Sequence, residues 1–156
     1  MDYLTELKTI QMWVKAVAGM NSVRLKEAKP KLARPVILWE TPSREKKNNI
    51  GQYVYIQSVR QYGRLFANSL DDALDVQEKL TKDLEGKGGV LPIMQEGILL
   101  GYLKAAVIEF NTSESLDVPF NIAYEVTYGN TRPVEAPNAT YVGTRVDTLG
   151  AELTQN

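Results

Sequence analysis

The sequence predicts an α+β protein with a mostly antiparallel sheet and two helices packed on it. Two segments show the apolar spacing of helices, and four others show the patterns of strands. The strands come in runs joined by loops instead of alternating with helices, which favours α+β over α/β. The 156 residues fit one domain, which we place at residues 1–130, with residues 131–156 forming an extended C-terminal arm.

Both helices are predicted from apolar residues that recur every three or four positions. In the first, residues 2–18, the stripe consists of Leu4, Leu7, Ile10, Val14 and Val17. Trp13 lies beside this stripe and either packs in the core or faces a partner. The second helix begins after Ser69, and its stripe consists of Ala73, Val76, Leu80 and Leu84. The glycines at 86–89 end this helix, and they do not form a phosphate loop because no strand precedes them.

Four strands are expected from β-branched, aromatic or alternating residues: 36–40, 53–67, 98–110 and 120–128. The second has apolar residues on both faces, so we expect it to be central and covered on each side, with a bulge or bend at Gly63. The third is expected to bend near Gly101. Residues 41–51 are polar and rich in turn formers, which predicts a loop that is mobile in the free subunit.

Residues 21–34 are basic and irregular, with a short edge strand suggested by the alternation of Val23 and Leu25. The five basic residues are Arg24, Lys26, Lys29, Lys31 and Arg34. Two interpretations stay open for them. They form a solvated loop whose lysines block unwanted strand pairing, or they make a weak contact with an anion or phosphate.

The composition argues against an enzyme. The chain has no cysteine and no histidine, which excludes thiolate chemistry, histidine bases and the common zinc sites. Asp71 and Asp75 share a helix face without further ligands, and Glu109 and Glu125 could face each other only if their strands were in register. We therefore expect no catalytic residues, no metal and no other cofactor.

Charge and hydropathy suggest a cytosolic protein without a broad nucleic-acid surface. The 18 basic and 19 acidic residues give a net charge of −1, without the basic excess of proteins that bind nucleic acid over a broad surface. No apolar stretch approaches the roughly 20 residues of a membrane span. The first residues lack the basic start and apolar core of a signal peptide.

Aromatic residues in the predicted strands are the best candidates for contacts with other proteins, because a tyrosine buries apolar area while keeping a polar tip. The alternative is that they line a sheet face covered by helices. The candidate interface residues are Trp39, Tyr53, Tyr55, Tyr62, Tyr141 and Arg145.

The order of elements resembles the tail-terminator or tail-completion proteins of long-tailed bacteriophages. The segments that carry the resemblance are residues 69–75 (SLDDALD) and residues 120–128 (FNIAYEVTY), the latter typical of the closing strand in that family. The resemblance covers residues 2–129, and the arm beyond is longer than in many members.

The resemblance implies a structural protein of the virion, located at the tail end or neck and in the host cytoplasm during assembly. Such subunits form a hexameric ring that caps the tail tube and joins it to the head-closure or connector protein. DNA is a partner only as it passes through the ring, and no membrane is involved. The rival functions are a dimeric, ligand-binding or regulatory domain of ferredoxin-like type and a neighbouring head-closure neck protein.

Deleting residues 131–156 is expected to leave a folded monomer that assembles poorly. The arm has few large apolar groups to pack in a core, yet its Tyr141–Val142 and Arg145–Val146 pairs are suited to a neighbour's sheet edge. A thermal melt beside a native mass measurement tests this. A large loss of stability with assembly intact would contradict it.

Overall fold

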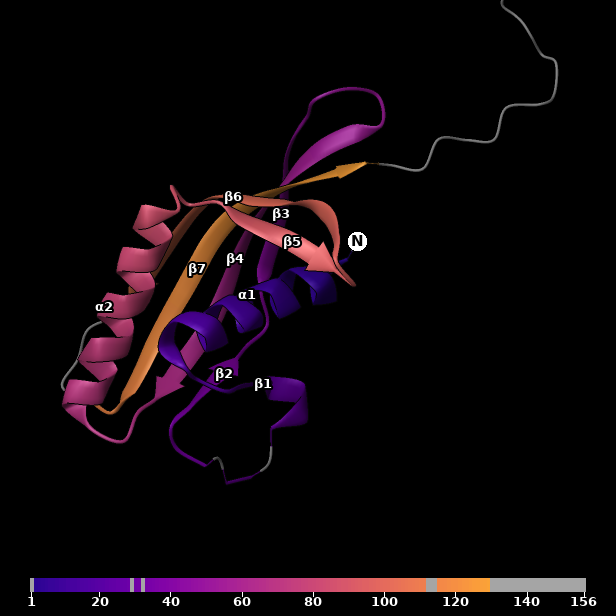
Figure 1. Ribbon diagram of the computed structural model, residues 1–156. Coiled ribbons are helices and arrows are strands. Elements are labelled where there is room, and N and C mark those ends of the chain that lie inside the picture. The colour runs from indigo at the N-terminus through magenta and orange to yellow at the C-terminus, as the bar shows by residue number, and fades with distance from the viewer. Residues whose placement is uncertain (1, 29, 32, 112–114, 130–156) are drawn as a thin grey trace, which may run out of the picture.

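The computed structural model describes residues 2–28, 30–31, 33–111 and 115–129, and it confirms the α+β class. Two helices pack on a curled sheet in which seven strands are described (Figure 1). The elements in chain order are α1 (Tyr3–Ala18), β1 (Ser22–Arg24), a short 3-10 turn (Leu25–Glu27), β2 (Val36–Trp39), β3 (Ser43–Asn49), β4 (Val54–Phe66), α2 (Leu70–Gly86), β5 (Leu91–Gln95), β6 (Ile98–Phe110) and β7 (Asp117–Gly129). The predicted C-terminal arm lies outside the described residues.

The sheet has the strand order β1-β2-β4-β7-β6-β5, and β3 pairs with β4 on the same side as β2. The β1–β2 pair is parallel and the other pairs are antiparallel. The longest ladder joins β4 to β7 from Val54 opposite Gly129 to Phe66 opposite Asp117, without a register shift. This ladder places β4 and β7 at the centre of the sheet.

Both helices begin and end where the sequence predicts. The Asp2 side chain accepts a hydrogen bond from the Thr5 N–H, and the Ser69 hydroxyl accepts one from the Asp72 N–H. Gly19 ends α1 in a left-handed conformation with φ 69°. The predicted stripe of α2 is buried, as are the middle residues of the α1 stripe. Leu4, near the start of the helix, is exposed instead.

Trp13 packs in the core, which was one of the two interpretations of this residue, and it does not face a partner. Its indole Nε1 donates a hydrogen bond of 2.6 Å to Asp83, which joins α1 to α2. Hydrogen bonds from Lys87 and from Trp13 lower the pKa of Asp83. The buried indole N–H therefore has the partner that burial of a polar group requires.

Two strands were missed by the sequence analysis. Residues 41–51 were expected to be a loop, but Ser43–Asn49 form β3, paired with β4 from Ser43 opposite Arg60 to Asn49 opposite Tyr55. The strand is held by backbone hydrogen bonds to β4. Its side chains are polar, so they lack the β-branched and aromatic residues from which a strand is predicted. The second is β5, joined to β6 by a turn in which Glu96 and Gly97 have positive φ, as a two-residue hairpin turn requires.

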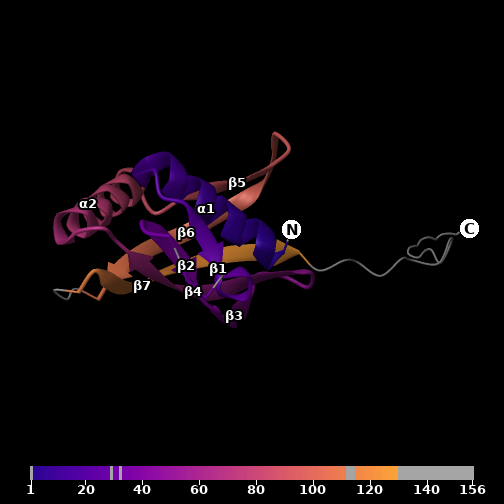
Figure 2. The ribbon, with the colours of Figure 1, turned by 90° about the horizontal axis from the view of Figure 1, so that it is seen from below.

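The helices cover only one face of the sheet, so the expectation that β4 is covered on both sides is wrong. Figure 2 shows α1 and α2 on the same side of β4 and β7. Core residues of β7 alternate strictly, and they are Val118, Phe120, Ile122, Tyr124 and Val126. The intervening side chains of β7 lie on the opposite, uncovered face.

The basic segment includes the predicted edge strand, because Ser22–Arg24 pair with β2. Leu25 belongs to the 3-10 turn that follows and is exposed. Arg34 forms an ion pair with Asp117 at the start of β7. The irregularity expected near Gly101 is present, since the β5–β6 register shifts between Ile93 and Met94, opposite that glycine.

Gly63 makes room for aromatic rings and does not form the bulge that was expected. The β4–β7 register runs through it unbroken. A Cβ at this position would lie 2.7 Å from Phe120 Cζ and 3.1 Å from Trp39 Cε3. The rings of Trp39 and Phe120 pack edge to face, 5.4 Å apart, over the glycine.

Gly63→Ala is expected to lower the free energy of unfolding by about 1–3 kcal/mol, because the added methyl group displaces Phe120 in a packed core. Urea denaturation measures the loss. Gly51→Ala is the matched control, since a Cβ at Gly51 meets nothing within 4 Å. Equal stability of the two variants would contradict this account.

Candidate functional site: assembly surfaces

The described residues do not bring catalytic or metal-binding groups together. No cluster of three or more Asp or Glu residues suited to a metal ion occurs among them. Glu109 and Glu125 are offset along the sheet, with Glu109 opposite Asn121 and Glu125 opposite Lys104. Glu125 pairs with Lys47, and Glu109 lies 3.9 Å from Arg60. The acid–base pair considered from the sequence is therefore not formed.

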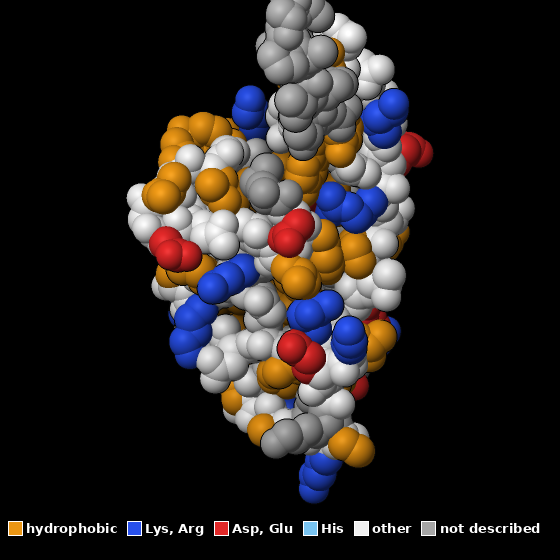
Figure 3. All heavy atoms as spheres, turned by 90° about the vertical axis from the view of Figure 1, so that its right-hand side faces the viewer, with side chains coloured by type: hydrophobic (Ala, Val, Ile, Leu, Met, Phe, Trp, Pro, Cys, Tyr) orange, Lys and Arg blue, Asp and Glu red, His pale blue; other side chains and the backbone are white. Residues whose placement is uncertain are grey.

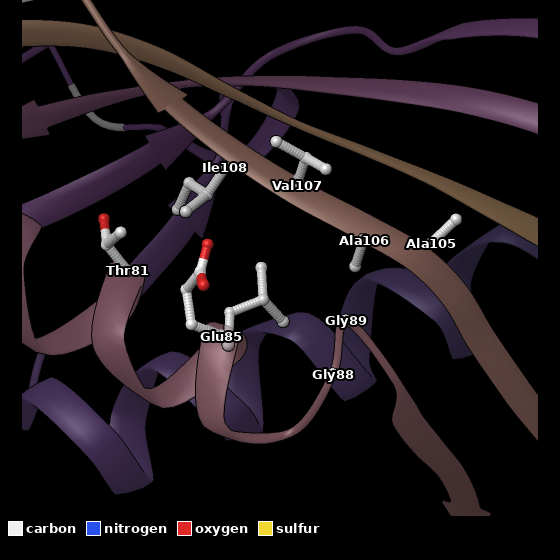
Figure 4. A pocket seen from close by; sticks show the side chains of 9 residues that line it. Thr81, Glu85, Gly88, Gly89, Ala105, Ala106, Val107 and Ile108 are labelled. Atoms are coloured by element: carbon white, nitrogen blue, oxygen red, sulfur yellow. The ribbon is translucent and has the colours of Figure 1, made fainter.

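An open cavity of about 320 Å³ lies where the end of α2 meets β6. It arises because β6 bulges between Lys104 and Val107, with Ala105 at φ 51°. Figure 4 shows Thr81 and Glu85 pointing from α2 toward the strand, whereas Val107 points to the other side of it. Glu85 is the one titratable side chain in the lining, so we find no basis for chemistry in this cavity.

The N-terminal end of α1 contains a buried carboxylate, Glu6, which has no exposed surface. Arg44 of β3 donates to both of its oxygens, at 2.9 and 3.1 Å, and the Tyr124 hydroxyl donates to Oε1 at 2.8 Å. The Arg44 guanidinium also lies over the rings of Tyr3 and Tyr128. The buried charge is therefore paired and hydrogen-bonded, as a stable structure requires.

The protonation states of this network follow from its surroundings. Burial raises the pKa of Tyr124, and the adjacent Glu6 carboxylate raises it further, so the phenol keeps its proton and donates. For Arg44, burial disfavours the charge, but the hydrogen bonds and charge of Glu6 outweigh burial and raise its pKa. The network thus joins a protonated tyrosine and a charged pair.

This network positions β3 against the domain. The other residues of β3 are mostly exposed and supply no apolar anchor. Arg44 ties the strand to α1 through Glu6 and to β7 through Tyr128, and Lys47 adds an ion pair with Glu125 of β7. Tyr128 stacks on Tyr55 of β4 at the same place, with ring centroids 5.8 Å apart. The sheet edge formed by β3 is consequently held in one arrangement.

The uncovered sheet face carries paired charges between apolar side chains. Arg60 donates to Asn121, and Arg64 lies 4.0 Å from Glu40. Tyr62 and Val107 are exposed on this face. The charges of this face are therefore mostly paired within the described part of the chain.

Among the described residues, several exposed apolar side chains gather at the tip of the β5–β6 hairpin and on the neighbouring side of α1. We name this group the hairpin patch, and its members are Leu4, Met12, Met94, Ile98, Leu99 and Leu100. A depression of about 510 Å³ between α1 and the hairpin turn brings Leu4, Met12 and Met94 together. Figure 3 shows this side of the molecule, where hydrophobic side chains lie among Lys and Arg side chains.

The structure describes four of the six predicted interface residues, and their environments differ. Trp39 is only 2% exposed and packs in the core, so it is wrong as a surface contact. Its strand, β2, is buried along its whole length. Tyr53 and Tyr55 are half-buried, and Tyr62 is exposed on the uncovered face. Tyr141 and Arg145 lie outside the described residues.

The sequence analysis missed the hairpin patch and the Glu6–Arg44 pair. The run from Ile98 to Leu100 directly after Glu96–Gly97 was a usable signal of an apolar hairpin tip. Glu6 was interpreted only as a residue of the first helical turn. No local pattern indicates that it meets an arginine 38 positions away.

Comparisons with known proteins do not assign a family. No protein-family model matches the chain, and no curated protein matches its sequence. One solved structure without a functional description shares 12% identity over 84% of this chain and 94% of its own, with a TM-score of 0.45. That likeness is too weak to support an argument about function. Neither helix in the described residues has the length and hydropathy needed to span a membrane.

Arg44→Met is expected to destabilise the fold by about 3–5 kcal/mol, because it leaves the Glu6 carboxylate buried without its cation. Glu6→Gln should cost less, since Arg44 keeps 24% of its side chain exposed and can reach water. The double variant should lose less stability than the sum of the two single variants. Urea denaturation of all three tests this, and strict additivity would contradict it.

Proposed function

We propose that the chain is a structural subunit of a bacteriophage tail-terminator ring, which caps the tail tube and joins it to the head connector. The resemblance of the element order to that family suggests the assembly. The hairpin patch is the observation that carries the proposal. A soluble monomer rarely exposes so many neighbouring large apolar side chains, and such patches mark contacts with other proteins.

The positions of the surfaces fit a ring. A closed ring needs two different surfaces on each subunit, one for each neighbour. The hairpin patch lies at the β5 end of the strand order, and β3 lies on the opposite edge of the sheet. The Glu6–Arg44 pair fixes β3 before any contact is made, which reduces the entropy that ordering this edge would cost on assembly.

The ligand-binding rival has less support. A regulatory domain of that kind would bind a small molecule between sheet and helices, but this space is filled by buried side chains such as Ile10, Leu80 and Phe120. The described cavities lie at the margins of the helical layer. The head-closure alternative would also use these surfaces for assembly. It differs from the tail-terminator proposal in the partner that the assembled ring contacts.

The double variant Ile98→Ser/Leu99→Ser is expected to shift the protein from ring to monomer in native mass measurement. These side chains are 64% and 48% exposed, so their removal costs the monomer little stability. Circular dichroism and the melting temperature of the variant monomer should therefore stay close to those of the unchanged protein.

Leu74→Ser is the matched control, because Leu74 is 50% exposed on α2, outside the hairpin patch. It should leave the ring intact. A wild-type protein that is a dimer would favour the regulatory domain instead. A ring that survives the double variant would remove the hairpin patch from the assembly contact.

A further inference from the structure

A groove lies between α1 and β5, the last strand in the order of the described sheet. Two depressions form it, one of about 510 Å³ near the start of α1 and one of about 220 Å³ nearer the middle of the helix. The side chains of Met12 and Met94 border both depressions, which therefore adjoin. The two walls, Asp2–Met12 of α1 and Leu91–Gln95 of β5, are each about 17 Å long. This α1–β5 groove thus has the length of a strand of about five residues.

The α1–β5 groove combines apolar side chains with an open strand edge. Met12 and Met94 are both exposed. Among the described strands, β5 pairs only with β6, so its other edge has no strand beside it. An extended segment that adds to such an edge gains backbone hydrogen bonds, and its alternate side chains fill the neighbouring pockets. The groove therefore suits an extended polypeptide with small apolar side chains.

The rim of the groove carries charges of both signs. Lys8 of α1 and Glu96 of the hairpin turn border the larger depression. Within the described part of the chain, neither of them forms an ion pair. A segment that has one basic and one acidic residue among apolar residues complements this rim better than a segment with charges of one sign.

The chain itself contains such a segment at residues 141–147 (YVGTRVD). Successive side chains of a strand point to opposite faces. An extended conformation would therefore place Val142 and Val146 on one face, and Arg145 and Asp147 on the other. The two valines match the apolar floor of the groove, and the two charged residues match its rim.

The length of chain before this segment favours the groove of a neighbouring copy over that of the same copy. The last described strand ends at Gly129, and residues 130–140 span at most about 40 Å when extended. A domain of this size is roughly 35 Å across. Pro133 and Pro137 each fix φ, which makes a connection of this kind stiffer. The connection is thus long enough to cross one subunit and poorly suited to fold back sharply.

We propose that residues 141–147 of one copy lie in the α1–β5 groove of the next copy, as a strand added beside β5. Val142 and Val146 contact Met12 and Met94, and Arg145 pairs with Glu96. The arm of each subunit thereby covers part of the hairpin patch of its neighbour. This inference rests on the proposed ring, and it names the segment that the hairpin patch contacts there.

A crosslinking experiment tests the contact, because the chain has no cysteine of its own. Full-length Gln95→Cys is mixed with full-length Thr144→Cys, and a short bifunctional maleimide is added. Gln95 is exposed and borders the groove, so its replacement leaves the apolar contacts in place. Docking raises the local concentration of the two thiols, so linked pairs of copies should exceed those from Leu74→Cys mixed with Thr144→Cys by about tenfold or more.

Substitutions of the contacting side chains show whether the link depends on the groove. Adding Val142→Ser/Val146→Ser to the Thr144→Cys chain should lower the yield of linked pairs about tenfold, as a loss of apolar burial on this scale predicts. Val134→Ser is the matched control, since it removes a valine from the arm outside residues 141–147. Its yield should equal that of the unsubstituted arm.

The outcomes separate this inference from the ring itself. It is overturned by a yield equal to that of the Leu74→Cys control, by a yield insensitive to Val142→Ser/Val146→Ser, or by Gln95→Cys copies linked to one another instead. A link formed within one copy that carries both cysteine substitutions, without links between copies, assigns the groove to the copy's own arm and also overturns it. Native mass measurement of the same samples reports the ring independently. A hexamer without the link rejects only the arm contact, and a link without a hexamer supports the arm contact and rejects the ring.

Discussion

The ladder between β4 and β7 is the constraint on which the rest of the structure depends. It pairs two long strands over their full length and brings the alternating core residues of β7 under both helices. All other strands add to its two sides, so the sheet ends in edges of different character. The helices pack on one face of this ladder, and the described residues place no helix on the opposite face.

The buried Glu6 network has a consequence for how one of these edges behaves. A buried ion pair contributes little net stability compared with apolar packing, but it tolerates few alternative arrangements. Here it joins α1, β3 and β7 through Arg44 and Tyr124. A polar strand without apolar side chains is thereby held in one register at the surface. An edge strand with a defined register pairs less readily with unrelated strands, because only a strand of matching pattern can add to it.

Two surfaces that meet at the N-terminal end of α1 differ in chemistry. The hairpin patch is apolar and gains free energy from any contact that removes it from water. A cavity of about 270 Å³ is bordered by the charged side chains of Arg24, Lys26 and Glu40. Contacts that combine an apolar patch with a charged site obtain affinity from the first and orientation from the second. Both surfaces lie outside the filled core, so changes to them can be separated from changes to folding.

The sequence by itself determined the helices, their caps, the central strands and the absence of cysteine and histidine chemistry, because these depend on local periodicity and composition. Tertiary structure alone decided the rest. Backbone pairing turned the polar residues of β3 into a strand, packing buried Trp39 where an interface was expected, and one-sided helix packing exposed the outer face of β4. The Glu6–Arg44 contact joins residues distant in the chain. Local sequence cannot specify such contacts, since they exist only once the strands have paired.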